Sequence, residues 1–434
     1  MAAGLRLLNR FASMEVIDRL GLRESAARLL QGATRTTART ATRAGRTFAA
    51  ATRLRNPVRQ SRAGAGSLFD LTPSEEQQML RDSVREFALE RLRPAAAAAD
   101  TAGAIPHEVL AQANELGLTT IGVPEELGGA LGQRSAVTSA LIAEALAQGD
   151  LGTAFACLAP LGVATAISLW GDAEQQARYL HEFVSDDAPA AALALLEPQA
   201  LFDPFRLATR AQRSPGGGFV LDGVKALVPR AAEDELFLIA AQLDGDRPRP
   251  ALFIVESRTS GLSVEPEPAM GLRPAATGRL ILEHAAIGAD ALLAEGAPEV
   301  YADCVALARL GWCALTVGTG QAVLDYVIPY VNQRVAFGEP ISNRQAVAFT
   351  VANIAIELDG MRLATYRAAS RVDQGLPFRR EVALARRLCA EHGAWIGSEG
   401  VQLLGGHGYT KEHPVERWYR DLRAAGVMEG GLLL

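Results

Sequence analysis

The chain has 434 residues, of which 49% are apolar and 6% aromatic, and its formal net charge at pH 7 is −6. This length and apolar content allow a large core spread over two or three domains, which excludes a disordered or low-complexity protein. No nucleic-acid partner is expected. Four cysteines show no paired spacing, so the sequence indicates neither a disulfide framework nor a metal site: Cys157, Cys304, Cys313 and Cys389.

The chain begins with a basic segment. Residues 1–65 contain thirteen arginines and three acidic residues, a net charge of +10 that leaves −16 on the remainder. Leu5, Leu8 and Phe11 recur at helical spacing among the arginines. This pattern is typical of an organellar transit peptide, of a segment on an anionic membrane surface, or of a simple extension. We therefore predict an extension over residues 1–68 and a cytoplasmic protein with peripheral membrane contact, or a mitochondrial matrix protein if the segment is a transit peptide.

Residues 69–190 are predicted to form a helical domain. Thr72 to Glu75 match a capping box with proline at the first helical position, and helical patterns follow over residues 108–116 and 136–147. The run from Leu151 to Gly171 contains no charged residue over twenty-one positions. Because it contains Pro160, we interpret it as a buried pair of helices rather than a membrane span.

The pattern changes at residue 191. Short β-type runs over residues 219–221, 236–240, 252–255 and 280–282 predict a small β barrel or sandwich over residues 191–292, with turns at Ser214–Gly218 and Asp222–Gly223. Long helical patterns over residues 301–324, 345–374 and 379–404 predict a C-terminal four-helix bundle over residues 293–434. The fold class expected is mainly α with a central β domain.

Three elements near the C-terminus carry the chemical signal. They are a glycine turn beginning at Gln402, the pair Arg420-Asp421, and the pair Glu429-Gly430. Glycine after a carboxylate lets the backbone approach a ligand without a Cβ in the way, so side chain and main chain could act on the same substrate. A Gly-Gly-x-Gly turn alone is weak evidence, but the order and spacing of all three elements are specific.

This stretch resembles the C-terminal signature of the acyl-CoA dehydrogenase family. The resemblance implies that Gln402, Gly405 and Gly406 contact flavin adenine dinucleotide (FAD), that Glu429 is the catalytic base, and that Gly430 lies beside the substrate. The family's helix–sheet–helix layout matches the elements expected over residues 69–434.

A second block extends the resemblance. Arg334, Phe337 and Gln345 match the family's Arg-x-x-Phe-Gly block, in which the arginine reaches the flavin pyrophosphate across a dimer interface and the glutamine lies near the adenine end. An arginine fork suits phosphate, although Arg334 could also serve as a helix C-terminal cap. Arg309 falls at the family's arginine beside the substrate and the base. Some members carry their base at the position before it, and Ala308 there leaves Glu429 as the candidate.

The β domain departs from the family pattern. Leu196, Phe202 and Pro229 stand where the family has threonine, serine and threonine near the flavin. Contacts from Leu196 and Val228 could still be offered by the backbone.

The resemblance implies a FAD-dependent acyl-CoA dehydrogenase of fatty acid β-oxidation and lipid metabolism, which converts an acyl-CoA to a trans-2-enoyl-CoA and passes electrons to an electron-transfer flavoprotein. A homodimer or homotetramer is expected. Two alternatives stay open at this point: a subunit with a degenerate flavin site in a heteromer with a related subunit, and a related flavin monooxygenase.

Overall fold

The computed structural model describes residues 72–130, 134–185, 188–245 and 247–429. Chain contacts divide the protein into Met1–Phe69 and Asp70–Leu434, and the described residues all belong to the second unit. The expected extension over residues 1–68 lies outside the described residues, as does Gly430.

The N-terminal part of this unit is helical. Its α-helices are α4 (Glu75–Phe87), α5 (Arg93–Ala102), α6 (His107–Glu115), α7 (Ala136–Ala147), α8 (Leu151–Trp170) and α9 (Ala173–Tyr179), and a π-helical segment, η2 (Ala88–Leu92), joins α4 to α5. The capping box predicted at Thr72 is wrong by two residues. Ser74 caps α4 by accepting from the Gln77 N–H at 3.2 Å, and the Gln77 side chain accepts from the Ser74 N–H at 3.0 Å. Thr72 to Glu75 and Ser74 to Gln77 both match the capping-box pattern, but Pro73 lies outside the helix, so the second match forms the cap.

The prediction of two helices over residues 151–171 is wrong, because α8 is one continuous helix that contains Pro160. Proline removes one hydrogen bond of the helix, but Pro160 itself is buried, and so are Ala156 and Ala164 one turn away on either side, so packing holds the backbone in place. At the start of α8, Asp150 accepts from the Thr153 N–H at 2.9 Å. By length and composition two helices of the described part could cross a membrane, α8 and α10 (Pro298–Gln333), but 67% and 61% of their most apolar windows are buried inside the protein.

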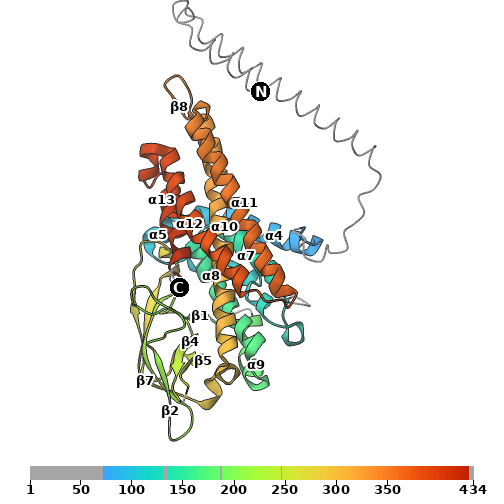
Figure 1. Ribbon diagram of the computed structural model, residues 1–434, viewed down its shortest axis with the longest axis vertical. Helices are drawn as coiled ribbons and strands as arrows, with labels where there is room; N and C mark the ends of the chain where they lie inside the picture. Colours follow the sequence, from blue (N-terminus) through green and yellow to red (C-terminus); the bar gives the residue numbers. More distant parts are fainter. Residues whose placement is uncertain (1–71, 131–133, 186–187, 246, 430–434) are drawn as a thin grey trace, which may run out of the picture. The chain divides into compact units, whose positions relative to one another are not determined.

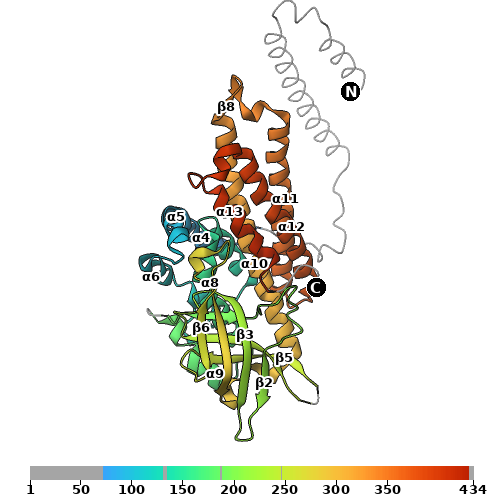
Figure 2. The same cartoon turned by 90° about the vertical axis from the view of Figure 1, so that its left-hand side faces the viewer.

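The β domain forms one curled sheet in the described residues. Its strands are β1 (Ala191–Ala194), β2 (Arg210–Arg213), β3 (Phe219–Val228), β4 (Leu236–Leu243), β5 (Arg249–Glu256), β6 (Leu262–Pro266) and β7 (Gly278–Ile287). The order is β1-β4-β2-β3-β7-β6, with β5 on the other edge of β4. Figure 2 shows the face of this sheet on which β2, β3, β5 and β6 are labelled. The turn predicted at Asp222–Gly223 is wrong, because β3 continues through these residues with a β-bulge. Glycine is required at position 223, where φ is 147° and a Cβ would lie 2.6 Å from the Thr209 Cα.

The C-terminal part contains the longest helices (Figure 1). They are α10, α11 (Gln345–Asp373) and α12 (Arg379–Leu404), followed by the short α13 (Val415–Asp421). Helix α10 continues through Pro329, beyond its expected end at residue 324. A small hairpin, β8 (Val335–Ala336) and β9 (Glu339–Pro340), links α10 to α11.

Helix α7 joins the two helical parts by packing against both α10 and α11. The approach to α10 is close at Gly318, where a Cβ would lie 2.1 Å from the Glu144 carbonyl oxygen. Helix α8 in turn packs against α7, α10 and β1 (Figure 1). Three helices and one strand therefore enclose a common space.

Candidate active site

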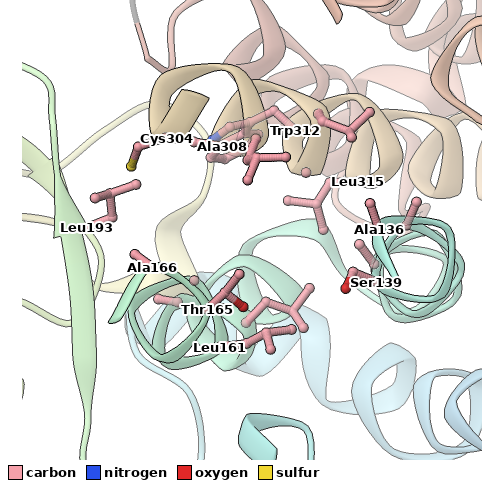
Figure 3. Close-up of a pocket in the computed structure, with 18 of the residues that line it drawn as sticks. Ala136, Ser139, Leu161, Thr165, Ala166, Leu193, Cys304, Ala308, Trp312 and Leu315 are labelled. Atoms are coloured by element: carbon pink, nitrogen blue, oxygen red, sulfur yellow. The ribbon is translucent and has the colours of Figure 1, made fainter. Parts of the chain in front are cut away.

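A cavity of about 200 Å³ lies in this space, between α7, α8 and α10. Leu193 of β1, Pro229 after β3, and Glu429 complete its lining. Figure 3 shows Leu193 and Cys304 at one end and Leu315, Ala136 and Ser139 at the other. Most lining side chains are apolar, and among the described residues the charged ones are Arg134 and Glu429. The cavity therefore suits an apolar chain with polar groups at defined points.

Glu429 reaches this cavity from a strained turn. Its φ of 52° lies in the left-handed region, which costs a residue with a Cβ about 1–2 kcal/mol. Arg309 on α10 holds the turn by donating to the Glu429 carbonyl oxygen from Nε at 3.0 Å and from Nη2 at 2.7 Å. Arg386 on α12 donates to the carbonyl of Met428. Both arginines thus bond to the backbone and leave the Glu429 carboxylate facing the cavity.

The carboxyl of Glu429 is set up to hold or accept a proton near neutral pH. Glu429 is 6% exposed, and its Oε2 has no hydrogen-bond partner among the described residues. Burial raises the pKa of Glu429 to about 7, although the charges of Arg386 and Arg309 and a hydrogen bond with Trp312 act in the opposite direction. A buried carboxyl with a pKa near the working pH is the usual form of a general base.

An aromatic pair lies beside the carboxyl. Phe155 of α8 and Trp312 of α10 have ring centroids 4.6 Å apart and an interplanar angle of 49°. Because each ring comes from a different wall of the cavity, the pair bridges α8 and α10 at the level of Glu429. It fixes the width available to a bound chain.

The residues predicted to touch the flavin from the bundle lie elsewhere. Arg334 follows the last turn of α10, about 33 Å along the helix from Trp312 at 1.5 Å per residue. Phe337, in the β8–β9 hairpin, is 94% exposed and has φ 56°. Gln345 is exposed at the start of α11, and Gln402 is exposed near the end of α12.

The glycine turn of Gly405 and Gly406 lies at the same end of the bundle. Tyr330, one turn before Arg334, donates to the Leu404 carbonyl at 3.3 Å and bonds to His407 Nδ1 at 2.9 Å. The structure therefore gathers the bundle-side candidates with one another but separates them from Glu429 within one chain.

The β-domain candidates lie nearer the cavity. Pro229 lines it directly, and Val228, the residue before, ends β3. Leu196 and Phe202 are buried. Next to Leu196, Glu197 forms a buried ion pair with Lys225 at 2.9 Å and also accepts from the Ala208 and Thr209 N–H groups. This pair fixes the strand ends on which the candidates sit.

Arg420 and Asp421 connect separate parts of the fold through hydrogen bonds. The Arg420 guanidinium binds both carboxylate oxygens of Asp100 at 2.9 Å and donates to the Met270 carbonyl. Asp421 accepts from the Leu272 N–H at 2.7 Å. The pair ties the bundle to the N-terminal helices and to the β domain.

Several site residues were missed from the sequence. Phe155, Trp312 and Arg386 come from three different helices and Arg134 from the segment before α7, and no local motif marks them. Trp312 had the best available signal, because it lies three residues after Arg309 and so shares a face of α10 with it.

Comparisons with known proteins agree with this architecture. Family models described as acyl-CoA dehydrogenase N-terminal, middle and C-terminal domains match residues 74–187, 192–285 and 299–431. The mitochondrial short-chain specific acyl-CoA dehydrogenase of Bos taurus is 34% identical over 366 residues, which is 82% of this chain and 87% of the relative.

Solved structures are similar as well. Butyryl-CoA dehydrogenase from Megasphaera elsdenii superposes with a TM-score of 0.78 at 26% identity, covering 84% of this chain and 97% of the other. A glutaryl-CoA complex of glutaryl-coenzyme A dehydrogenase gives a TM-score of 0.77 at 27% identity, covering 84% and 94%.

Proposed function

Since this chain belongs to the acyl-CoA dehydrogenase family, whose members depend on FAD, we propose that it oxidises a short acyl-CoA with Glu429 as the base. The observation that carries the proposal is the buried Glu429 carboxyl, with one unpartnered oxygen, in the wall of an apolar cavity. The product is the trans-2-enoyl-CoA.

The residues of the chain account for the proton transfer. A thioester makes the hydrogen on its α-carbon acidic, and the Glu429 carboxylate abstracts that proton. The Glu429 backbone N–H polarises the thioester carbonyl, and Arg309 fixes the position of both groups by holding the adjacent carbonyl. The apolar walls exclude water from the reacting carbons. When bound, FAD supplies the acceptor for the hydride that leaves the β-carbon.

The residues present fit FAD if two chains share it. In the described part Arg334 forms no ion pair, and Phe337 is almost fully exposed in a left-handed conformation, so both are available to a ligand of a second copy. At the β domain, Leu196 and Pro229 offer no side-chain donor. Contacts there therefore come from the backbone, including that of Val228, and from apolar surface. Gln345, Gln402, Gly405 and Gly406 would meet the same ligand from the bundle of the partner copy.

We assign a short acyl chain from the cavity itself. Its volume is about 200 Å³, and Phe155 and Trp312 bridge its walls beside Glu429. Similarity to relatives named for short-chain and butyryl substrates supports the same assignment.

A spectrum and a titration test the proposal. The purified chain should be yellow, and anaerobic butyryl-CoA should bleach the flavin band. Glu429→Gln should keep the bound flavin but lose the bleaching. If Glu429→Gln bleached as fast as the wild type, the assignment of the base would be wrong.

The replacements at Leu196, Phe202 and Pro229 favour one alternative, a subunit with a degenerate flavin site. A colourless chain that gains flavin only when a related subunit is added would support that alternative. Size-exclusion chromatography of the yellow or colourless protein would show which oligomer holds the flavin.

Two partners complete the proposal. An electron-transfer flavoprotein is the acceptor that the family resemblance implies, and reduction of that protein by the chain with butyryl-CoA tests it.

The arginine-rich residues 1–65 are proposed to contact an anionic membrane or to direct import into mitochondria. Deleting them should change fractionation of the protein between membrane and soluble fractions; unchanged fractionation would remove the membrane role.

A further inference from the structure

The end of the cavity away from the β domain is not wholly apolar. Leu315, Ala136 and Ser139 lie together there (Figure 3). Arg134, two residues before Ala136, lines the same cavity. Along α10 the step from Ala308 to Leu315 covers about 10 Å, so this end lies several carbon–carbon bonds from the site of proton abstraction at Glu429.

The Arg134 side chain is half-buried and has no protein partner among the described residues. Its Nε is buried and has no hydrogen-bond partner, and within the described residues Arg134 makes no ion pair. Burial lowers the pKa of Arg134, whereas the charge of Asp373 raises it. A guanidinium in such a place is costly unless an acceptor meets it.

Asp373 is the carboxylate whose charge acts on Arg134, but its oxygens already accept hydrogen bonds from other groups. Its oxygens accept from the Ser135 hydroxyl at 2.8 Å and from the Ala136 and Val137 N–H groups at the N-terminus of α7. Asp373 therefore caps α7. The Ser139 hydroxyl donates to the Ser135 carbonyl at 3.1 Å, so its proton is also used.

We propose that Arg134 binds a carboxylate at the end of the acyl chain remote from the thioester, so that the substrate is the monothioester of a short dicarboxylic acid. This substrate class rests on the proposed function, because the thioester end must lie at Glu429. A carboxylate supplies the two planar acceptors that a guanidinium fork prefers, whereas a terminal methyl group would leave the half-buried charge of Arg134 unpaired. The apolar wall between the two charged residues accommodates the intervening methylene groups.

The test compares chains of equal carbon number. Anaerobic flavin reduction is measured with glutaryl-, adipyl- and pimelyl-CoA against pentanoyl-, hexanoyl- and heptanoyl-CoA, which span the estimated distance. The wild type should prefer the carboxylate member of at least one pair by roughly 10- to 100-fold in kcat/KM, the range expected for a hydrogen-bonded ion pair. Arg134→Met should reduce that preference by a similar factor, and Arg134→Lys should retain part of it.

Two controls separate the outcomes. Thermal melting of Arg134→Met and Arg134→Lys shows whether either substitution disturbs folding, and binding of adipyl-CoA to Glu429→Gln measured by calorimetry reports recognition without turnover. An equal or greater rate with the methyl-ended chains, or a preference unchanged in Arg134→Met, would overturn the role of Arg134 while leaving the dehydrogenase intact. Failure of every acyl-CoA to reduce the flavin would instead reject the proposed function.

Discussion

Replacing Glu429 by Gln should stabilise the protein above neutral pH while removing its activity. Burial raises the pKa of the carboxyl from 4.5 to about 7, so the folded state keeps a proton that the unfolded state has already lost between these values. Folding stability must therefore fall as the pH rises through this window, because the native state binds more protons than the unfolded state. Above about pH 7 the folded protein carries the whole cost of a buried carboxylate.

The size of this effect follows from the two pKa values. Their difference corresponds to roughly 3 kcal/mol at 1.36 kcal/mol per pH unit. Glutamine has the same shape and no charge, and the bonds from Arg309 and Arg386 go to backbone carbonyls, so the substitution leaves them in place. We expect Glu429→Gln to gain roughly 3 kcal/mol over the wild type at pH 8, and less than 1 kcal/mol at pH 5. Flavin reduction by butyryl-CoA should fall by about 10²–10⁴-fold or more.

Urea denaturation at fixed chain concentration, repeated from pH 5 to pH 8, measures the stability difference. Glu283→Gln is the matched control, because Glu283 is an exposed glutamate on β7 away from the cavity. In the wild type, kcat/KM should rise with pH through about pH 7 as the base loses its proton. A stability difference that does not change with pH would refute the burial argument, and a pH profile flat across neutrality would refute the role of the carboxylate.

Three further substitutions probe the architecture. Trp312→Ala should widen the cavity and shift the preference in kcat/KM from butyryl-CoA toward longer chains, at a stability cost of about 3–5 kcal/mol; an unchanged chain-length profile would contradict the role of the aromatic pair. Lys225→Met should cost about 3–5 kcal/mol in urea denaturation because Glu197 is left buried and unpaired, and Lys225→Met with Glu197→Gln should cost less; equal losses would mean that the two charges do not interact. Gly318→Ala should separate α7 from α10 and lower the melting temperature, since the new Cβ would meet the Glu144 carbonyl, whereas Gly311→Ala, which meets nothing within 4 Å, should have little effect.

The sequence predicted the fold well because the signals are local and periodic. Helix α12 begins and ends at residues 379 and 404, as the pattern indicated, and the change to β-type runs at residue 191 coincides with the start of β1. Errors arose where the surroundings outweigh local preference. Pro160 predicted a break, but the buried packing of Pro160 and of Ala156 and Ala164 one turn away keeps α8 continuous. Asp222-Gly223 predicted a turn where pairing with β7 extends β3.

The candidate site likewise contains residues that the sequence predicted and properties that only the fold determines. Glu429 and Arg309 belong to motifs with fixed spacing, and the structure brings them together 120 residues apart in the chain. The raised pKa of Glu429 could not be predicted, because it arises from burial among groups on other elements. The separation of Arg334 and Phe337 from Glu429 likewise follows from the length of α10, which the sequence underestimated.

The sequence by itself was enough to predict the order of the domains, the family, and Glu429 as the candidate carboxylate, because each prediction depends on the spacing of residues along the chain. Tertiary structure decided the shape of the cavity, the Phe155–Trp312 bridge and the position of Arg134 at its far end. These features depend on which faces of α7, α8 and α10 meet, and helix packing is set by side chains distant in sequence. What the proposed base Glu429 acts on is therefore decided by the packed helices, whereas the sequence motif alone was enough to predict that residue as the base.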